Sequence, residues 1–367
     1  MDGMIWTGIH PTALVEPGAR IGRGVEIGPF CHVGPDAVLE DGVRLVSHVV
    51  VAGHTRIGAG AVLYPFCTVG LAPQDLKYRG EPTRCEIGPR TQIREHCSIH
   101  RGTATGAGVT RVGADCLLMA VVHVAHDCQI GDGVVIANNV VMGGHVSIGD
   151  HAVIGGSAAL HQFVRIGRCA MVGGVSGVEA DVIPFGSVIG NRARLAGLNV
   201  VGLRRRGVER ARLHRLRVAF RHLFAASGTA AHAASGEASR GASTASEAPA
   251  DPASGARAAP AVFAARLAEV RRLHGDDPLV AEILAFIETP SKRGLIRAAV
   301  AADAPAGATA AAPPEADAAP GRAASVTLGT AALAASGTAA HAASGTAAHA
   351  ASGTAAHAAS GEADKAA

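Results

Sequence analysis

Aliphatic side chains recur at every sixth position along the first half of the chain. The series starts at Ile9 and, after two interruptions, continues without a gap from Val112 to Val178. An α-helix has no period of six, and a sheet with one exposed face alternates every two residues. The period fits a β-helix of short strands and tight turns, in which three hexads form one coil. Residues 18 apart then stack about 4.8 Å from each other.

The pattern divides the chain into three parts. We expect residues 1–190 to form an all-β domain, a parallel β-helix, followed by a smaller α-helical C-terminal domain over residues 191–297. A segment at about 225–260 is rich in Ala, Ser and Gly and predicts a disordered insertion. Residues 298–367 predict a disordered Ala/Ser/Gly/His tail, built on the repeated octad SGTAAHAA. Helical spacing predicts helices around Leu213, Leu216, Phe220 and Leu223, over Val262 to His274, and over Pro278 to Glu288.

Two segments interrupt the six-residue period, Leu71 to Arg84 and Arg101 to Arg111. Both are predicted loops, and long loops on a rigid scaffold usually carry function. The seven cysteines include no CxxC pair. Five of them lie four places after a period residue, in the second inward slot of a hexad. This spacing predicts packing rather than disulfides or metal ligation.

Composition limits the classes of partner. Net charge is +3, too small to indicate a nucleic-acid-binding protein. Aromatic residues make up only 3%, so the core is predicted to be aliphatic. The N-terminus lacks a secretory signal, and the uncharged stretch 323–360 is too weakly apolar to be a membrane span. We therefore expect a cytoplasmic protein.

A cluster of polar residues is predicted on one outer wall of the coil. The segment VHVAHDC brings His123 and His126 close together in sequence. Steps of 18 from His126 reach Gly144 and Gln162, which predicts a vertical column spanning about 10 Å. His145 and His161 each lie one place beside this column. We place His123 at the end of the preceding face, near a corner.

This cluster allows three interpretations. A solvated polar wall is the simplest. A zinc site needs three converging donors, and His123 could join such a set only with a neighbouring subunit, so we predict no metal. A general base is the interpretation we favour, because a neutral imidazole suits removal of a hydroxyl proton. The Gly144 N–H could stabilise the oxyanion of an acyl transfer, and the inward Cys128 argues for direct transfer without an acyl-enzyme.

Several motifs resemble one family of enzymes. They are IGPFCHVGP (27–35), SHVVVAGHT (47–55), QDLKYRGEPTR (74–84), IHRGT (99–103), AHDC (125–128), LHQF (160–163) and GLRRRG (202–207). Together they resemble the acyl-[acyl-carrier-protein]–UDP-N-acetylglucosamine O-acyltransferases, which catalyse the first step of lipid A biosynthesis. The resemblance covers about residues 5–225 and resumes at 262–297, so the insertion and the tail depart from it.

The resemblance implies a left-handed, hexapeptide-repeat β-helix that assembles as a homotrimer and needs no cofactor. It implies transfer of a 3-hydroxyacyl chain from acyl carrier protein to the 3-hydroxyl of UDP-N-acetylglucosamine. By position, His126 would be the general base, Asp127 would orient it, and Gly144 would supply the oxyanion N–H. Contacts with the nucleotide sugar or the phosphopantetheine arm are implied for Asp75, Lys77, His145, Gln162, Asn199, Arg205 and Arg206. We add His123 and His161 as candidate substrate-binding neighbours.

One further position concerns the length of the acyl chain. Gly174 stands above Gly156, Asn138 and Ala120 in a predicted column of small outward residues. In the family this position limits the acyl chain, so a glycine implies a long donor. A departure is Val201, where the family usually carries Glu. Arginines of the predicted helical face suggest a docking surface for an acidic carrier protein: Arg210, Arg212, Arg215, Arg217 and Arg221.

Other functions stay open at this point. The N-acyltransferase two steps later in the same pathway carries an extra N-terminal uridine-binding domain, for which a period that begins at Ile9 leaves no room. An acetyl-CoA-dependent sugar acetyltransferase would differ in its donor. A metal-dependent β-helix carbonic anhydrase is a less favoured alternative. A structural β-helix such as an ice-binding protein would need a flat array of Thr on one face, whereas the outer columns here are mixed.

Overall fold

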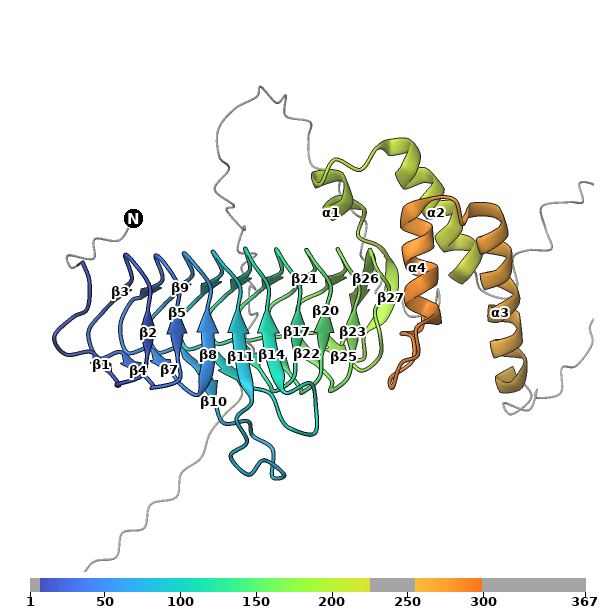
Figure 1. Ribbon diagram of the computed structural model, residues 1–367. Coiled ribbons are helices and arrows are strands. Elements are labelled where there is room, and N and C mark those ends of the chain that lie inside the picture. The colour runs from blue at the N-terminus through green and yellow to red at the C-terminus, as the bar shows by residue number, and fades with distance from the viewer. Residues whose placement is uncertain (1–6, 225–254, 299–367) are drawn as a thin grey trace, which may run out of the picture. The chain divides into compact units, whose positions relative to one another are not determined.

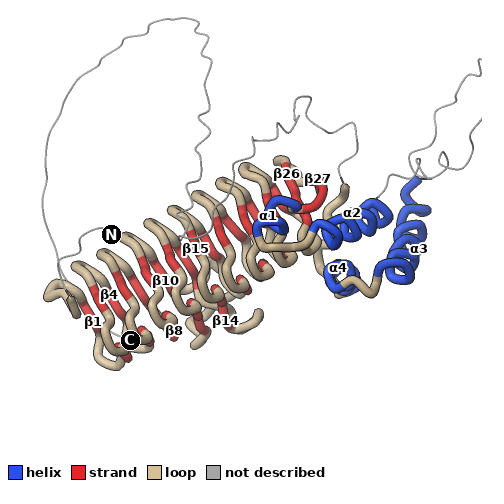
Figure 2. The backbone as a smooth tube through the Cα atoms, turned by 90° about the horizontal axis from the view of Figure 1, so that it is seen from above, coloured by secondary structure: helices blue, strands red, loops and turns tan. Residues whose placement is uncertain are grey.

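The computed structural model describes residues 7–224 and 255–298 (Figure 1). The predicted insertion therefore lies largely outside the described residues, as does the predicted tail beyond Ala298. Within the described part, a long stack of coils is followed by helices (Figures 1 and 2). The division of the chain into domains at residue 190 stays a prediction.

The coils contribute their strands to three sheets, which are the three faces of one β-helix. Sheet A contains β3 (Glu26–Ile27), β6 (Arg44–Leu45), β9 (Val62–Leu63), β12 (Gln92–Ile93), β15 (Leu117–Leu118), β18 (Val135–Ile136), β21 (Val153–Ile154), β24 (Met171–Val172), β26 (Gly186–Ile189) and β27 (Arg194–Leu198). Sheet B contains β1 (Leu14–Val15), β4 (His32–Val33), β7 (Val50–Val51), β10 (Thr68–Leu71), β13 (Ser98–His100), β16 (His123–Val124), β19 (Val141–Met142), β22 (Ala159–Leu160) and β25 (Gly177–Val178). Sheet C contains β2 (Arg20–Ile21), β5 (Val38–Leu39), β8 (His54–Ile57), β11 (Arg84–Ile87), β14 (Val109–Val112), β17 (Gln129–Ile130), β20 (Ser147–Ile148) and β23 (Arg165–Ile166).

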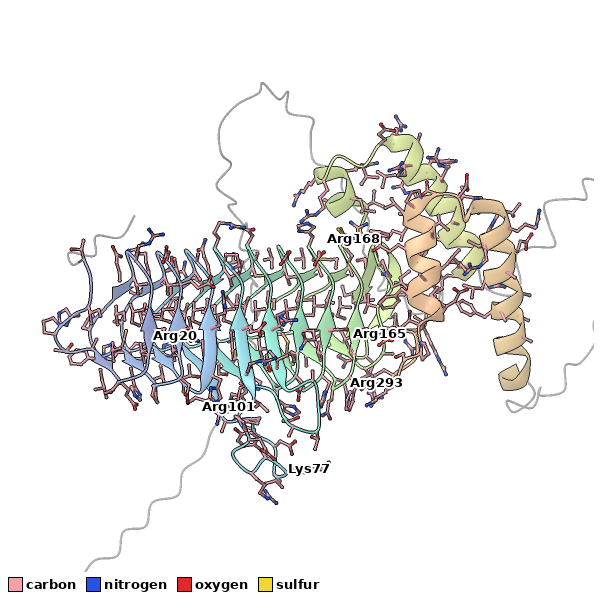
Figure 3. All side chains as sticks on the ribbon, viewed as in Figure 1. Arg20, Lys77, Arg101, Arg165, Arg168 and Arg293 are labelled. Atoms are coloured by element: carbon pink, nitrogen blue, oxygen red, sulfur yellow. The ribbon has the colours of Figure 1, made fainter. Side chains whose placement is uncertain are left out.

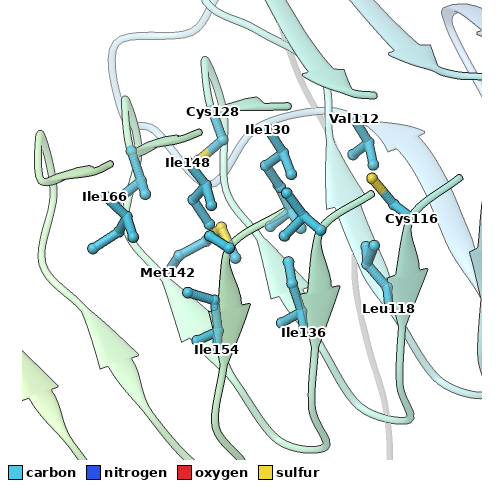
Figure 4. Packing of buried hydrophobic residues seen from close by; sticks show 14 of the residues in the cluster. Val112, Cys116, Leu118, Cys128, Ile130, Ile136, Met142, Ile148, Ile154 and Ile166 are labelled. Carbon is cyan, nitrogen blue, oxygen red and sulfur yellow. The ribbon is translucent and has the colours of Figure 1, made fainter. Parts of the chain in front are cut away.

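The six-residue period is the cause of this architecture. Neighbouring strands within a sheet are parallel, except for β26 and β27 at the end of sheet A, which are antiparallel. Residue pairs such as Val135 and Val153 lie 18 apart in sequence. Each period residue points inward, where Ile136 and Ile154 are fully buried and stack in a column (Figure 4). Ile9 is the exception among these residues, because it is 51% exposed. The protein is a left-handed parallel β-helix, which confirms the predicted fold.

The cysteines pack inside the coil, as the spacing predicts. All seven are free and buried. Burial is the largest influence on the Cys128 thiol and raises its pKa to about 12, so the group stays protonated and acts as a small apolar side chain. Figure 4 shows Cys116 and Cys128 among the aliphatic residues of the core.

The two interruptions of the period are loops inserted without loss of register. Thr68 pairs with Ser98, which is 30 residues away instead of 18, and Ser98 pairs with His123, which is 25 away. The first loop covers residues 72–83. The second loop is shorter than predicted, because residues from Val109 onward form β14 and pair with β11. Residues 101–108 alone form this loop.

In the described ranges, four helices follow the last coil: α1 (Val200–Arg205), α2 (Arg210–Phe224), α3 (Gly255–His274) and α4 (Pro278–Glu288). The predicted apolar face is confirmed, since Leu213, Leu216 and Leu223 are buried. Helix α3 begins at Gly255, inside the segment predicted to be an insertion. None of the helices among the described residues is long and apolar enough to cross a membrane.

The chain after α4 returns to the coil. Leu295 forms a bridge with Asp181, and Ala298 forms one with Leu195. Ala298 therefore belongs to a paired segment rather than to the predicted tail. The buried carboxylate of Asp181 also accepts hydrogen bonds from Arg165. These contacts hold residues 291–298 against the last coils, next to the site described below.

Candidate active site

A groove of about 610 Å³ runs along sheet B beside the first loop. The loop contributes Gln74, Asp75 and Lys77, and the coils contribute His100, His123, Ala125, His126, Val141, Met142, Gly143, Gly144, Ala159, Leu160 and Gln162. Six of the residues predicted from sequence therefore meet in one groove: Asp75, Lys77, His123, His126, Gly144 and Gln162. Figure 3 shows Lys77 on the loop that projects from the coil.

His126 and Asp127 form a buried hydrogen-bonded pair. The Nδ1 atom of His126 lies 2.8 Å from Oδ2 of Asp127, whose side chain is fully buried. Burial by itself would raise the pKa of Asp127, but hydrogen bonds from Thr103 and His126 outweigh it, and the pKa lies below its ordinary value. An ionised carboxylate can only accept hydrogen bonds, so Nδ1 carries the proton and Nε2 the free lone pair. This is the tautomer that a base acting through Nε2 requires.

The loop at residues 101–108 encloses Asp127. Thr103 donates to the carboxylate from its hydroxyl, at 2.6 Å, and from its N–H, and the Gly108 N–H donates as well. The Asp127 N–H donates to the hydroxyl of Thr110 at 2.8 Å. Sequence analysis missed both threonines: Thr103 lies in a loop without a period that would place its residues, and Thr110 belongs to β14, in a stretch that was predicted to be loop. The motif IHRGT, which ends at Thr103, was the one available signal.

Gly144 lies directly against the imidazole of His126. A Cβ atom at this position would stand 2.5 Å from Cε1 and 2.7 Å from Nε2 of His126, closer than any side chain tolerates. The predicted column is confirmed by backbone hydrogen bonds, from the N–H of His145 to the carbonyl of His126 and from that of Phe163 to the carbonyl of Gly144. Glycine is therefore the residue that leaves His126 room in the groove.

A ladder of rings continues from His126. The ring of His145 meets that of His126 edge-on, with centroids 5.1 Å apart, and stacks on Phe163 at 4.5 Å. The ammonium of Lys292, from the returning C-terminal segment, lies 4.1 Å from the centroid of Phe163. Burial lowers the pKa of His145, and Lys292 lowers it further, against an opposing effect of Asp127. The lowered pKa favours the neutral form of His145.

The placement of His123 was predicted wrongly. It is the first residue of strand β16 and does not end the preceding face. Each two-residue strand consists of an inward period residue and the outward residue just before it, and His123 is the outward residue of β16. Its Nδ1 lies 2.7 Å from the hydroxyl of Ser98, and burial lowers its pKa. Its ring packs edge-on against His100, which sequence analysis missed. The pKa of His100 is lowered to about 4, first by burial and then by His123 and His126.

Seven predicted residues do not line this groove: Asp127 and His145 adjoin His126, Gly174 lies on another corner, and His161, Asn199, Arg205 and Arg206 lie elsewhere. His161 is exposed next to Gln162. Asn199 caps helix α1, where its Oδ1 accepts from the Gly202 N–H and its Nδ2 donates to the Cys169 carbonyl. Arg205 and Arg206 are exposed at the other end of α1.

The predicted column of small residues lies on another corner of the coil. Backbone hydrogen bonds link Val175 to Gly156 and Ser157 to Asn138, which confirms the stacking. Gly174 is exposed, and a Cβ atom there would lie 3.3 Å from the carbonyl oxygen of Gly156. A side chain at position 174 would therefore project outward with only a modest adjustment.

The arginines of α2 are only partly available to a partner. The Arg215 guanidinium donates to Asp277 at 3.2 Å, and that of Arg212 lies 4.0 Å from the same carboxylate. Asp277 is buried and caps α4 through the Leu279 N–H. Two of the five arginines predicted to form a docking surface therefore fix the helices to each other.

His126, Asp127 and His145 are residue types that can bind a metal ion. Their ligand atoms lie within 4.8 Å of one another. However, the carboxylate of Asp127 already accepts from Thr103, Gly108 and His126, and the last of these bonds also occupies Nδ1 of His126. A metal ligand must offer a free lone pair. The hydrogen-bonded arrangement therefore favours acid–base chemistry over metal binding.

Comparison with known proteins gives a consistent result. Residues 181–252 match the family "UDP N-acetylglucosamine O-acyltransferase; Domain 2", and residues 18–53 and 110–144 match the bacterial transferase hexapeptide repeats. The acyl-[acyl-carrier-protein]–UDP-N-acetylglucosamine O-acyltransferase of Azorhizobium caulinodans is 46% identical over 287 residues, which are 78% of this chain and 94% of the relative. That of Rhizobium johnstonii is 49% identical over 221 residues, 60% of this chain and 81% of the relative.

Solved structures agree with these relatives. The UDP-N-acetylglucosamine O-acyltransferase of Moraxella catarrhalis is 38% identical with a TM-score of 0.67, and the match covers 79% of this chain and 99% of that one. The Arabidopsis UDP-N-acetylglucosamine acyltransferase is 33% identical with a TM-score of 0.63, over 79% of this chain and 100% of that one.

Proposed function

The chain belongs to the acyl-[acyl-carrier-protein]–UDP-N-acetylglucosamine O-acyltransferase family, and from this premise we propose that it transfers a 3-hydroxyacyl group from acyl carrier protein to the 3-hydroxyl of UDP-N-acetylglucosamine. The reaction is the first step of lipid A biosynthesis. The observation that carries the proposal is the buried His126–Asp127 pair, which opens onto a groove beside Gly144.

His126 acts as the general base of the proposed reaction. Its Nε2 accepts the proton of the sugar 3-hydroxyl while the hydroxyl oxygen bonds to the thioester carbon. Asp127 holds the ring through Nδ1 and stabilises the imidazolium that forms, as carboxylates do in other histidine-dependent transferases and hydrolases. The carbon–sulfur bond then breaks, and the imidazolium returns the proton to the departing thiolate. No acyl-enzyme forms in this sequence.

Gly144 and Lys77 supply the charge stabilisation that the proposal needs. The carbonyl oxygen becomes an oxyanion in the tetrahedral intermediate, and the Gly144 N–H donates to it. The absence of a side chain at this position lets the thioester approach next to His126. Lys77, exposed at the rim of the groove, is a cation for the diphosphate of the nucleotide.

We further propose that the active form is a homotrimer. The groove of one chain is open on its outer side, and Asn199, Arg205 and Arg206 do not line it. Assembly places these residues over the groove of a neighbouring subunit, where they contact the nucleotide. Light scattering at assay concentrations tests the assembly, and a fully active monomer would contradict it.

The function is tested by product formation with purified full-length protein. UDP-N-acetylglucosamine is mixed with a series of 3-hydroxyacyl carrier-protein thioesters and, separately, with acetyl-CoA. The expected product is the 3-O-acylated nucleotide sugar, formed from a long 3-hydroxyacyl donor because Gly174 leaves its column open. Turnover with acetyl-CoA and none with the carrier thioesters would overturn the proposal.

A further inference from the structure

A second cavity, of about 340 Å³, lies between the last coil and the returning C-terminal segment. Four arginines line it: Arg192 and Arg194 from the end of the coil, and Arg293 and Arg297 from the segment after α4. The lining contains a single carboxylate, that of Glu179. Backbone pairing between Leu195 and Arg297 brings the two pairs of arginines to the same edge of the coil.

Most of this positive charge is not neutralised by the residues that the structure describes. Glu179 lies 3.7 Å from Arg192, and its carbonyl accepts from Arg293 at 2.9 Å. The guanidinium groups of Arg194 and Arg297 form no hydrogen bond or ion pair with any other described residue, and both side chains are exposed. Charge of one sign gathered in a concave site attracts a ligand of the opposite sign. The cavity is therefore suited to an anionic partner.

The position of the cavity relates it to the proposed active site. Steps of 18 from His126 pass through Gly144 and Gln162 and reach Ala180, which lines the cavity. At about 4.8 Å per coil, the arginines lie on the order of 14 Å further along the same wall. Figure 3 shows Arg293 toward the edge of the coil from which the Lys77 loop projects. A partner bound at the cavity can therefore direct a long, flexible arm into the groove.

We infer that the four-arginine cavity is the docking site for the acidic surface of the acyl carrier protein. This inference rests on the proposed function, because it is the carrier that brings the thioester. The four-arginine cavity replaces the arginine face of α2 as the main docking surface, since Arg212 and Arg215 are paired with Asp277. Arg194 and Arg297 contact the carrier's carboxylates, and the pantetheine arm follows the wall from Ala180 to His126.

The test compares two donors that carry the same acyl chain. The double variant Arg194→Glu/Arg297→Glu is prepared as the full-length chain, and kcat/KM is measured with the 3-hydroxyacyl carrier protein and with 3-hydroxyacyl-pantetheine. We expect kcat/KM for the carrier donor to fall at least tenfold, and its dependence on salt concentration to weaken, because like charges now face each other. The kcat/KM for the pantetheine donor and the KM for UDP-N-acetylglucosamine should stay close to those of the wild type.

Arg20→Glu is the matched control. It reverses the charge of an exposed arginine on β2, at the other end of the coil. The kcat/KM should stay unchanged with both donors. An equal loss with both donors would overturn the docking site, as would a selective rise in the KM for UDP-N-acetylglucosamine or dissociation of the oligomer. If the wild type does not use carrier thioesters at all, the proposed function fails first. That outcome is visible before any variant is made.

Discussion

Two corners of the same coil carry stacked rings, yet they are chemically very different. On the sheet A corner, Phe30, His48, Phe66 and His96 form an exposed ladder with centroids 4.8–4.9 Å apart. On the sheet B corner, Asp127, His145 and Phe163 occupy the equivalent turn positions, with His126 beside them. All seven turn residues have positive φ, between 51° and 69°. The backbone is therefore the same at both corners.

The difference lies in what surrounds the imidazoles. At the sheet B corner the first residue of the ladder is a carboxylate, and the loop at residues 101–108 buries it beneath Thr103 and Gly108. The exposed ladder contains no acidic residue, and none of the loops in the described part of the chain covers it. A ring stack is thus a by-product of the 18-residue repeat, whereas a buried ion with an oriented imidazole needs an inserted segment. The buried carboxylate with its oriented imidazole thus occurs where the repeat is interrupted.

Removal of an imidazole should have the most different effect on turnover at the two corners. We expect His126→Ala to lower kcat by about 10²–10⁴, the range for loss of a general base. His96→Ala removes an exposed ring from the other ladder and should keep near wild-type turnover. Both variants should melt as cooperatively as the wild type. Near-normal turnover of His126→Ala on the preferred donor would show that the proposed mechanism is wrong.

Asp127→Asn should lower kcat less than His126→Ala does, because the amide still reaches Nδ1 but carries no charge. The same variant tests the pKa of the carboxylate. The pKa of Asp127 is lower in the folded protein than its ordinary value in an unfolded chain. The ionised carboxylate therefore stabilises the fold at pH values above that ordinary pKa. This contribution is lost as the pH falls through the lowered native pKa.

Thermal melting from pH 6 downward measures that loss. The wild type should lose stability at acid pH through this group, and the Asn variant should lack that component. An identical acid dependence in the two proteins would mean that the Thr103 and Gly108 hydrogen bonds do not stabilise the ionised form.

Gly174→Met alters the sheet A corner beyond the end of its ring ladder, where side chains become small. The added side chain should block the column and shift preference toward shorter donors by tenfold or more in relative kcat/KM. Each excluded methylene forfeits about 0.8 kcal/mol of burial, so about two of them suffice. Ser147→Met, on the outward side of sheet C, is the control. An unchanged chain-length profile would make Gly174 a turn residue only.

Deletion of residues 299–367 should have the smallest effect. This segment lies outside the described residues, and its Ala, Ser and Gly composition offers little to pack on either corner. Activity and melting temperature should both stay close to those of the full chain, while the paired Ala298 is kept. A marked fall in either quantity would reveal a contact that composition does not predict.

The sequence predicted the parts of the site that obey the repeat. Because each hexad fixes which residue points inward, spacing alone stacked Gly144 on His126 and Gly156 below Gly174. It could not place Thr103, because residues 101–108 follow no period, nor Lys292, which reaches Phe163 from a distant segment. His123 was misplaced by a single position within its hexad, and one position is enough to move a side chain from a corner to a face.

The inserted loops also show that the coil can be lengthened in discrete steps. The chain leaves the coil for 12 extra residues after β10 and for 7 after β13, and each time it resumes the same register. An insertion of one whole coil between His126 and Gly174 would likewise leave every inward residue matched to a neighbour. It would move the two sites apart by about 4.8 Å and no other amount. Selectivity for donor length can thus evolve along two independent routes: gradually by substitution at one residue, or in quantised increments by duplication of a coil.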